Sequence, residues 1–229
     1  MSKGTIHRGR TLGRLRVRRA VTDPEHPRQR STKGERTRER IIDAAGELFS
    51  RSGYRAVSLR DIAAHAGLTH AGVLHHFPNK EATLIHVLSR RDAIDAPLVL
   101  DVGPNHGALI DNLVRIVERN TRTPGLVSLY VNLSAEATDP AHPAHDYFFA
   151  RYRILREHLV PTFAALLEGR PNPTPEVAAQ QFIALQDGLQ VQWLLEPGAI
   201  DMRAAVVSFL RTLGITTSDP LPPPDERPG

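Results

Sequence analysis

The sequence predicts an all-α protein with an N-terminal helix-turn-helix and a larger helical part after it. Apolar residues recur at helical spacing from about residue 35 to residue 213, and no stretch alternates as a half-buried strand does. Within residues 35–77, three short helical segments follow one another, with a Gly-containing turn between the second and the third. This order and spacing are typical of a helix-turn-helix.

The first helix is predicted over residues 35–52. Its apolar residues fall at i, i+1, i+4, i+7 and i+8, which places them on one helical face: Ile41, Ile42, Ala45, Leu48 and Phe49. Gly53 stands just past the last of them and is expected to end the helix. Arg36, Arg38 and Arg40 crowd its first turns.

The second helix follows in "SLRDIAAHAG", where Ser58 and Asp61 have the spacing of a capping box. Gly67 is expected to stop it. Thr69 is expected to cap the third helix, with Val73 and Phe77 pointing inward at i and i+4 and Pro78 breaking it.

Six longer helices are expected downstream. Capping residues, proline positions and apolar stripes place them at residues 79–94, 106–120, 124–138, about 143–169 with a kink at Pro161, 175–195 and 199–213.

Composition narrows the class of protein. The chain of 229 residues contains no cysteine, which excludes disulfides and thiolate metal sites. It contains no apolar run of membrane-spanning length and no secretory signal, so we expect a cytoplasmic protein. Residues 1–33 hold ten Lys and Arg against two acids, whereas residues 89–229 hold twelve against seventeen. The basic end is expected to seek a polyanion, although a solvated tail without a role fits the same composition.

Three stretches resemble the TetR family of bacterial transcriptional repressors. They are "RERIIDAAGELFSRSGY" (38–54), "VSLRDIAAHAGLT" (57–69) and "HHFPNKEATL" (75–84). A weaker likeness lies in "ALQDGLQVQWLLEPGAIDM" (184–202), which is similar to the penultimate helix of one TetR subgroup. The resemblance implies an N-terminal DNA-binding domain and a C-terminal helical domain that binds a small-molecule effector and forms a homodimer.

The resemblance also implies roles for single residues. His76 and Lys80 match phosphate-contacting positions, and Phe77 matches the residue that locks the recognition helix to the core. Independently, a helix N-terminus beside a lysine is a natural phosphate site. Ser58 and Arg60 are expected to position the protein on the DNA backbone. The full set of candidate DNA-binding residues is Arg38, Ser58, Arg60, Thr69, His70, Ala71, Leu74, His75, His76 and Lys80.

The recognition helix also departs from the family pattern. Leu74 stands where the family usually has Tyr, Ala71 where Gly is frequent, and Gly72 where Thr or a similar residue is usual. The family's base preferences therefore do not transfer. His70 is expected to donate to guanine, and Ala71 to meet a thymine methyl. Adjacent His75 and His76 point about 100° apart on a helix, so we expect no metal site there, and no cofactor.

The C-terminal candidates follow from the resemblance and from polar residues within apolar helices. The expected ligand pocket is lined by Tyr130, Asn132, Phe149, Gln186, Gln190 and Trp193, for which plain core packing is the competing interpretation. The expected dimer interface contains Gln181, Leu185, Leu189, Gln192 and Phe209, for which burial within one chain competes.

We therefore expect four parts: a disordered basic arm (1–33), a helix-turn-helix domain (34–83), a ligand-binding and dimerisation domain (84–215) and a disordered Pro-rich tail (216–229). The expected function is a transcriptional regulator that binds a palindromic operator as a homodimer and is released by a ligand. Two alternatives remain open. One is an architectural DNA-binding protein without an effector, and the other is a helical enzyme using His142, His145 and Asp146.

Overall fold

The computed structural model describes residues 32–100, 103, 105–170 and 172–218. Within this part of the chain the structure is all-α, as the sequence predicts, and it contains no strand. The helices are α1 (Lys33–Ser52), α2 (Leu59–His65), α3 (His70–His76), α4 (Lys80–Leu100), α5 (His106–Asn120), α6 (Pro124–Glu136), α7 (His145–Leu166), α8 (Pro175–Leu195) and α9 (Met202–Thr212). The expected basic arm, apart from its last two residues, and the Pro-rich tail beyond Ser218 lie outside the described residues.

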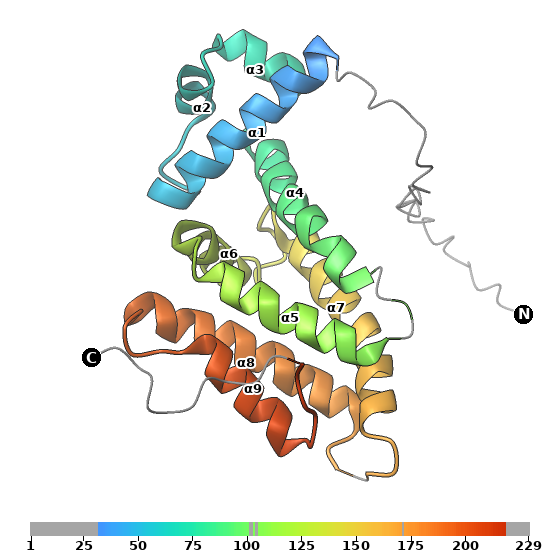
Figure 1. Cartoon of the computed structure of the whole chain (residues 1–229). Coiled ribbons are helices and arrows are strands. Elements are labelled where there is room, and N and C mark those ends of the chain that lie inside the picture. The colour runs from blue at the N-terminus through green and yellow to red at the C-terminus, as the bar shows by residue number, and fades with distance from the viewer. Residues whose placement is uncertain (1–31, 101–102, 104, 171, 219–229) are drawn as a thin grey trace, which may run out of the picture.

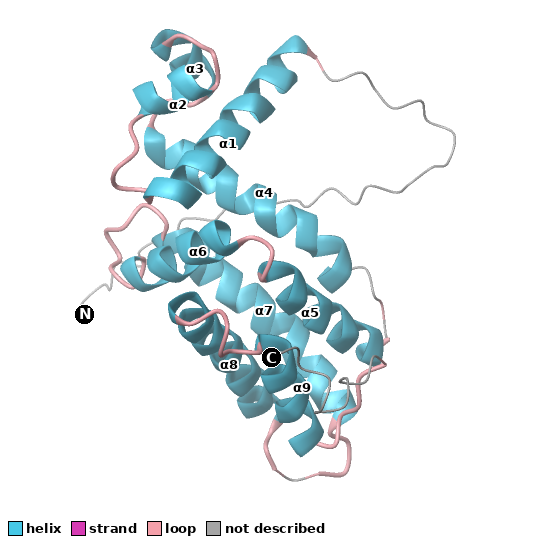
Figure 2. Ribbon diagram, turned by 60° about the vertical axis from the view of Figure 1, so that its left-hand side comes forward, coloured by secondary structure: helices cyan, strands magenta, loops and turns pink. Residues whose placement is uncertain are grey.

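Helices α1–α3 lie at one end of the molecule and α8 and α9 at the other (Figure 1). Helix α4 leads from the first group toward the middle helices, and α5, α6 and α7 lie between the two ends in both views (Figure 2). None of the described helices is long and apolar enough to cross a membrane.

Local hydrogen bonds set the starts of the first three helices. Ser58 and Asp61 form the predicted capping box of α2, and Thr69 caps α3 by accepting from the amide of Gly72. A further capping box, between Thr32 and Glu35, starts α1 slightly earlier than the sequence analysis placed it. Each box satisfies backbone donors that have no partner inside the helix.

Helix α4 is longer than predicted. It runs through Pro97 to Leu100, whereas the periodicity indicated an end near residue 94. Tertiary contacts from α5 hold this last part: the side-chain amide of Asn112 donates to the carbonyl of Leu98 at 2.8 Å, and Arg119 pairs with Asp95. A helix-breaking proline is thus outweighed by bonds to neighbours that local sequence does not reveal.

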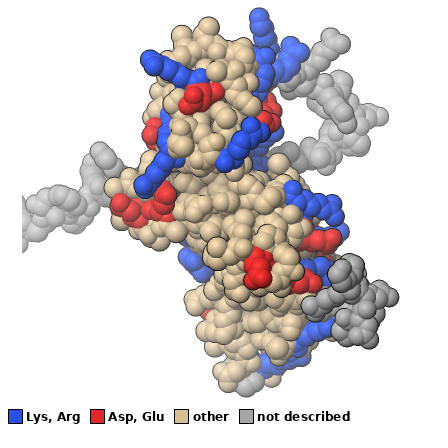
Figure 3. All heavy atoms as spheres, turned by 90° about the vertical axis from the view of Figure 1, so that its left-hand side faces the viewer, with Lys and Arg blue, Asp and Glu red and all other residues tan. Residues whose placement is uncertain are grey.

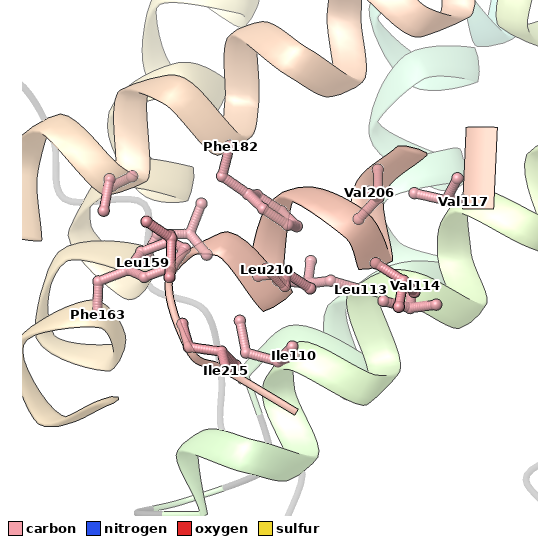
Figure 4. Packing of buried hydrophobic residues seen from close by; sticks show 14 of the residues in the cluster. Ile110, Leu113, Val114, Val117, Leu159, Phe163, Phe182, Val206, Leu210 and Ile215 are labelled. Carbon is pink, nitrogen blue, oxygen red and sulfur yellow. The ribbon is translucent and has the colours of Figure 1, made fainter. Parts of the chain in front are cut away.

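Two hydrophobic clusters form the interior. The N-terminal cluster joins α1–α4 and also takes in residues of α6 and α7, among them Leu129, Leu133 and Phe148. The C-terminal cluster joins α5, α7, α8 and α9, where Phe163, Phe182 and Leu210 are at most 1% exposed. Figure 4 shows Phe182 and Leu210 between the side chains of α5 and those of α7.

The contact between α1 and α6 depends on Gly125. A Cβ at this position would lie 2.8 Å from the backbone oxygen of Ser50, which is closer than real Cβ atoms approach. Only glycine therefore allows the start of α6 to pack directly on the end of α1.

We predict that Gly125→Ala lowers the free energy of unfolding by about 1–3 kcal/mol, because α6 must move away from α1. The matched control is Gly107→Ala, also at the second residue of a helix, where a Cβ would meet Asn105 at an ordinary 3.7 Å. Urea unfolding at one fixed protein concentration measures both. Equal stabilities of the two variants would show that α1 and α6 do not need this close approach.

Candidate DNA-binding surface and regulatory core

Helix α3 buries one face and exposes the other. Val73 and, just past the helix, Phe77 are 0% and 1% exposed and pack into the N-terminal cluster. The opposite face carries His70, Ala71 and His75, all exposed, and Leu74, which is 40% exposed. The four residues expected to face a DNA groove therefore lie on the open side of one short helix.

Gly72 is explained by the cap of this helix. Its amide donates to the Thr69 hydroxyl at 3.0 Å, and a Cβ on Gly72 would come within 3.2 Å of that same oxygen. The departure from the family pattern at Gly72 thus gives the cap more room, although glycine inside a helix costs about 1 kcal/mol relative to alanine.

Ser58 and Arg60 stand exposed at the start of α2. The Ser58 hydroxyl donates to Asp61 at 2.6 Å, and Arg60 has its side chain directed to solvent. Figure 3 shows Lys and Arg side chains projecting from the α1–α3 end of the face drawn there.

Lys80 is engaged inside the protein. Its ammonium donates to the carbonyls of Tyr54 and Val57 at 3.1 and 2.9 Å and lies 4.3 Å from the centre of the Tyr54 ring. It therefore fastens the connection between α1 and α2 to the start of α4. At most one of its three N–H donors is left for a phosphate.

Arg38 and His76 are also tied to each other. The Arg38 guanidinium donates to the His76 carbonyl at 3.0 Å, and both side chains are half-buried. Of the ten candidate residues, the structure brings together the exposed set on α2 and α3, whereas Arg38 and Lys80 point into the protein.

The C-terminal part contains a narrow interior gap between α5, α8 and α9. It is too narrow to admit a water molecule, and its lining includes the predicted residues Gln186 and Gln190. The rest of the lining was not anticipated from the sequence: Val117, Asn120, Leu189, Met202 and Val206. The side-chain nitrogen of Gln186 is buried there without a hydrogen-bond partner, which marks the gap as a place for a polar atom.

The other four pocket candidates lie elsewhere. Trp193 is 6% exposed in the C-terminal cluster, and Tyr130 belongs to a polar network described below. Asn132 is exposed in a groove of about 340 Å³ between the end of α1 and α6. Phe149 is 60% exposed and stacks on His145. The six residues therefore do not form one pocket in the described structure.

A polar network ties α4 to α6 and α7. The hydroxyl of Tyr147 donates to Asp92 at 2.5 Å, and Arg151 donates to the same carboxylate at 3.2 Å. Tyr130 donates to the carbonyl of Leu88 at 2.8 Å. Burial is the largest single influence on the pKa of Arg151 and would lower it, but the attraction of Asp92, Tyr147 and Tyr130 and the hydrogen bond to Asp92 together raise that pKa. No local sequence signal indicates these pairs.

The histidines of the enzyme alternative have structural partners. His142 Nε2 lies 3.5 Å from Glu136, and His145 Nδ1 lies 2.8 Å from the carbonyl of Ala137, so both brace the turn between α6 and α7. Among the described residues, no three His, Asp or Glu side chains converge on a point where a metal could bind.

An exposed recognition helix on a helix-turn-helix, joined to a larger helical core, defines a DNA-binding regulator. Residues 41–87 match the model for bacterial regulatory proteins of the tetR family, and residues 111–214 match the C-terminal model of BetI-type transcriptional repressors. The chain belongs to the TetR family of transcriptional regulators.

Two curated regulators illustrate the similarity in sequence. SrpR of Pseudomonas putida is 41% identical over 80 residues, which is 35% of this chain and 36% of that protein. PksA of Bacillus subtilis is 26% identical over 171 residues, 71% of this chain and 81% of the relative. The chain thus spans only about a third of SrpR's length.

Two solved structures share the fold. NalD, the secondary repressor of the MexAB-OprM multidrug efflux pump in Pseudomonas aeruginosa, superposes with a TM-score of 0.63 at 25% identity, covering 80% of this chain and 96% of NalD. The SmeT–triclosan complex superposes with a TM-score of 0.68 at 21% identity, covering 82% of this chain and all of that one.

We predict that none of the four tyrosines titrates near pH 10 in the folded protein. Burial raises the pKa of Tyr152 to about 12, and burial also raises the pKa of Tyr54, Tyr130 and Tyr147. Because these folded pKa values exceed the unfolded ones, the associated stability is complete below about pH 10 and is lost as the pH rises above it.

Absorbance at 295 nm against pH measures this. We expect little phenolate near pH 10 in the folded protein, and four ordinary titrations in denaturant. Tyr152→Phe should remove the first step seen in the folded protein. A tyrosine that ionises near pH 10 while the far-UV spectrum stays native would contradict the burial of its hydroxyl.

Proposed function

We propose that the chain is a repressor that binds a palindromic operator as a homodimer in the cytoplasm and leaves it when a small molecule binds the C-terminal part. The observation that carries the proposal is the division of α3 into a buried face, with Val73 and Phe77, and an open face. His70, Ala71, Leu74 and His75 on that face supply hydrogen-bond donors and an apolar surface suited to base edges in a major groove.

In this proposal, contacts to the DNA backbone come from other elements. Arg60 at the start of α2 is exposed and binds phosphate. Thr69 contributes mainly by capping α3, because its hydroxyl already accepts from Gly72. His76 contributes through its ring, because only its backbone carbonyl is bonded to Arg38. Lys80 contributes the one N–H donor that its bonds to Tyr54 and Val57 leave free.

We predict that Arg60→Ala and His70→Ala weaken DNA binding in different ways. Arg60→Ala should weaken binding to operator and scrambled duplex alike. It should reduce the slope of log affinity against log salt by about 0.9 per protomer, or about 1.8 for the dimer. His70→Ala should leave scrambled duplex unaffected and reduce the preference for the operator by about 1–3 kcal/mol.

The measurement is fluorescence anisotropy at several salt concentrations, with an operator recovered by selection from random duplexes. Selection that recovers no preferred sequence would favour the architectural alternative, in which random duplex binds nearly as well as any site. The enzyme alternative is favoured by no observation, and the relatives are named as regulators.

For dimerisation, the proposal rests on the exposed face of α8. Leu195 is 82% exposed and Val191 43%, and Gln181 and Gln192 are exposed on the same helix. Leu185 and Phe209 are half-buried, so they also have area to contribute, whereas Leu189 packs inside its own chain. An apolar residue as open as Leu195 is suited to meet a second copy.

We predict that Leu195→Lys shifts the protein toward the monomer, because a charge would enter the apolar interface. Ile94→Lys is the matched control, since Ile94 is 56% exposed on α4, far along the chain from α8. Sedimentation equilibrium measures the assembly state. A variant at Leu195 that stays as dimeric as wild type would place the interface elsewhere.

For the effector, the proposed site is the gap around Gln186. Because the gap admits no water molecule, binding requires α8 and α9 to separate from α5. Asn120 in its lining also accepts a hydrogen bond from Arg91 on α4 at 2.6 Å, so a ligand bonded to Asn120 competes directly with α4. The single tryptophan, Trp193, is buried in the same cluster and offers a fluorescence signal for effector screening.

A further inference from the structure

Arg38 lies on α1 but is directed toward the end of the recognition helix. One of its terminal nitrogens donates to the carbonyl of His76 at 3.0 Å, and the other contacts Nε2 of His86 on α4. The central carbon of its guanidinium lies 4.3 Å from the centre of the Phe77 ring. A single side chain thus touches α1, the end of α3 and α4.

The hydrogen bonds of His86 show which residue is the donor in its contact with Arg38. Its Nδ1 lies 2.8 Å from the carbonyl of Ala82, an acceptor, so Nδ1 carries the hydrogen. Nε2 then presents a lone pair, and the guanidinium donates to it. The His86 ring also meets the Phe77 ring edge to face at 5.1 Å, so the two rings and the guanidinium form one packed cluster.

Arg38 contacts the C-terminal end of α3, where a backbone carbonyl lacks a partner within the helix. His76 is the last residue of this seven-residue helix, and its carbonyl has no partner within the helix. The chain then turns away at Phe77, with φ −137° and ψ 116°, and reaches Pro78. Arg38 supplies the missing donor and so fixes where the end of the recognition helix lies relative to α1.

From these contacts we propose that Arg38 is a positioning residue, which His86 orients and which links the placement of α4 to the orientation of α3 on DNA. The inference rests on the proposed function, in which α3 reads the operator. It differs from the expectation that Arg38 binds a phosphate. A displacement of α4 moves His86, withdraws the orienting acceptor from Arg38 and releases the end of α3.

The Arg38→Lys variant separates the two roles. If Arg38 binds phosphate, lysine keeps the charge and most of the affinity, and Arg38→Ala lowers the salt slope by about 0.9 per protomer, or about 1.8 for the dimer. If Arg38 positions α3, lysine cannot replace the planar fork that reaches His76 and His86 together. Arg38→Lys should then lose about tenfold in affinity for the operator, with the salt slope and the affinity for scrambled duplex unchanged.

Arg36→Ala is the matched control, because Arg36 is exposed on the same helix. A second test is a double-mutant cycle on operator affinity. Arg38→Ala and His86→Ala should be non-additive, with the double variant losing little more than Arg38→Ala alone. Arg36→Ala and His86→Ala should add.

Amide hydrogen exchange in the absence of DNA completes the test, because it does not depend on finding an operator. Arg38→Lys and His86→Ala should speed exchange in α3 relative to wild type and to Arg36→Ala. Unchanged exchange in α3, or an Arg38→Lys variant that keeps its operator affinity, would overturn the inference. If wild type shows no preferred sequence but the variants still loosen α3, the proposed function fails while the positioning role stands.

Discussion

The placement of α4 by polar and charged side chains is the constraint on which the rest of the structure depends. These links join α4 to three neighbouring helices. His86 meets Arg38 and Arg90 meets Glu39 and Asp43 on α1, Arg91 meets Asn120 on α5, and Asp92 meets Tyr147 and Arg151 on α7. Such bonds have directional geometry, so they set the register of the helix, which apolar packing leaves less defined. Helix α4 therefore connects the DNA-binding end to both α5 and α7 of the C-terminal part.

The two hydrophobic clusters also connect the two ends of the molecule. Residues of α6 and α7, such as Leu133 and Phe148, pack in the same cluster as the residues that support α3. The DNA-binding end therefore shares a hydrophobic core with helices of the C-terminal part. Close-packed interiors move between discrete arrangements more readily than they deform, so under the proposed function an effector at the gap near Gln186 is expected to displace whole helices.

The helix-turn-helix was accessible to sequence reasoning because its signals are local. Ser58 and Asp61 are three residues apart, and so are Thr69 and Gly72, and these spacings bring the partners together on any helix start. The burial of Val73 and Phe77 likewise follows from their periodicity. The inward direction of the Arg38 and Lys80 side chains could not be predicted from the sequence, because their hydrogen-bond partners lie between 23 and 48 residues away along the chain. The end of α4 was missed for the same reason, since Asn112 holds it across Pro97.

The sequence by itself determined the all-α class, the starts of α2 and α3 and the exposed face of α3, because each rests on contacts within one or two turns. Only the tertiary structure decided which charged residues point inward and which face solvent. It also decided that Asn132 and Phe149 stand apart from Gln186 and Gln190. The physical reason is that periodicity defines the faces of a helix, whereas the neighbour that each face meets depends on how distant helices pack.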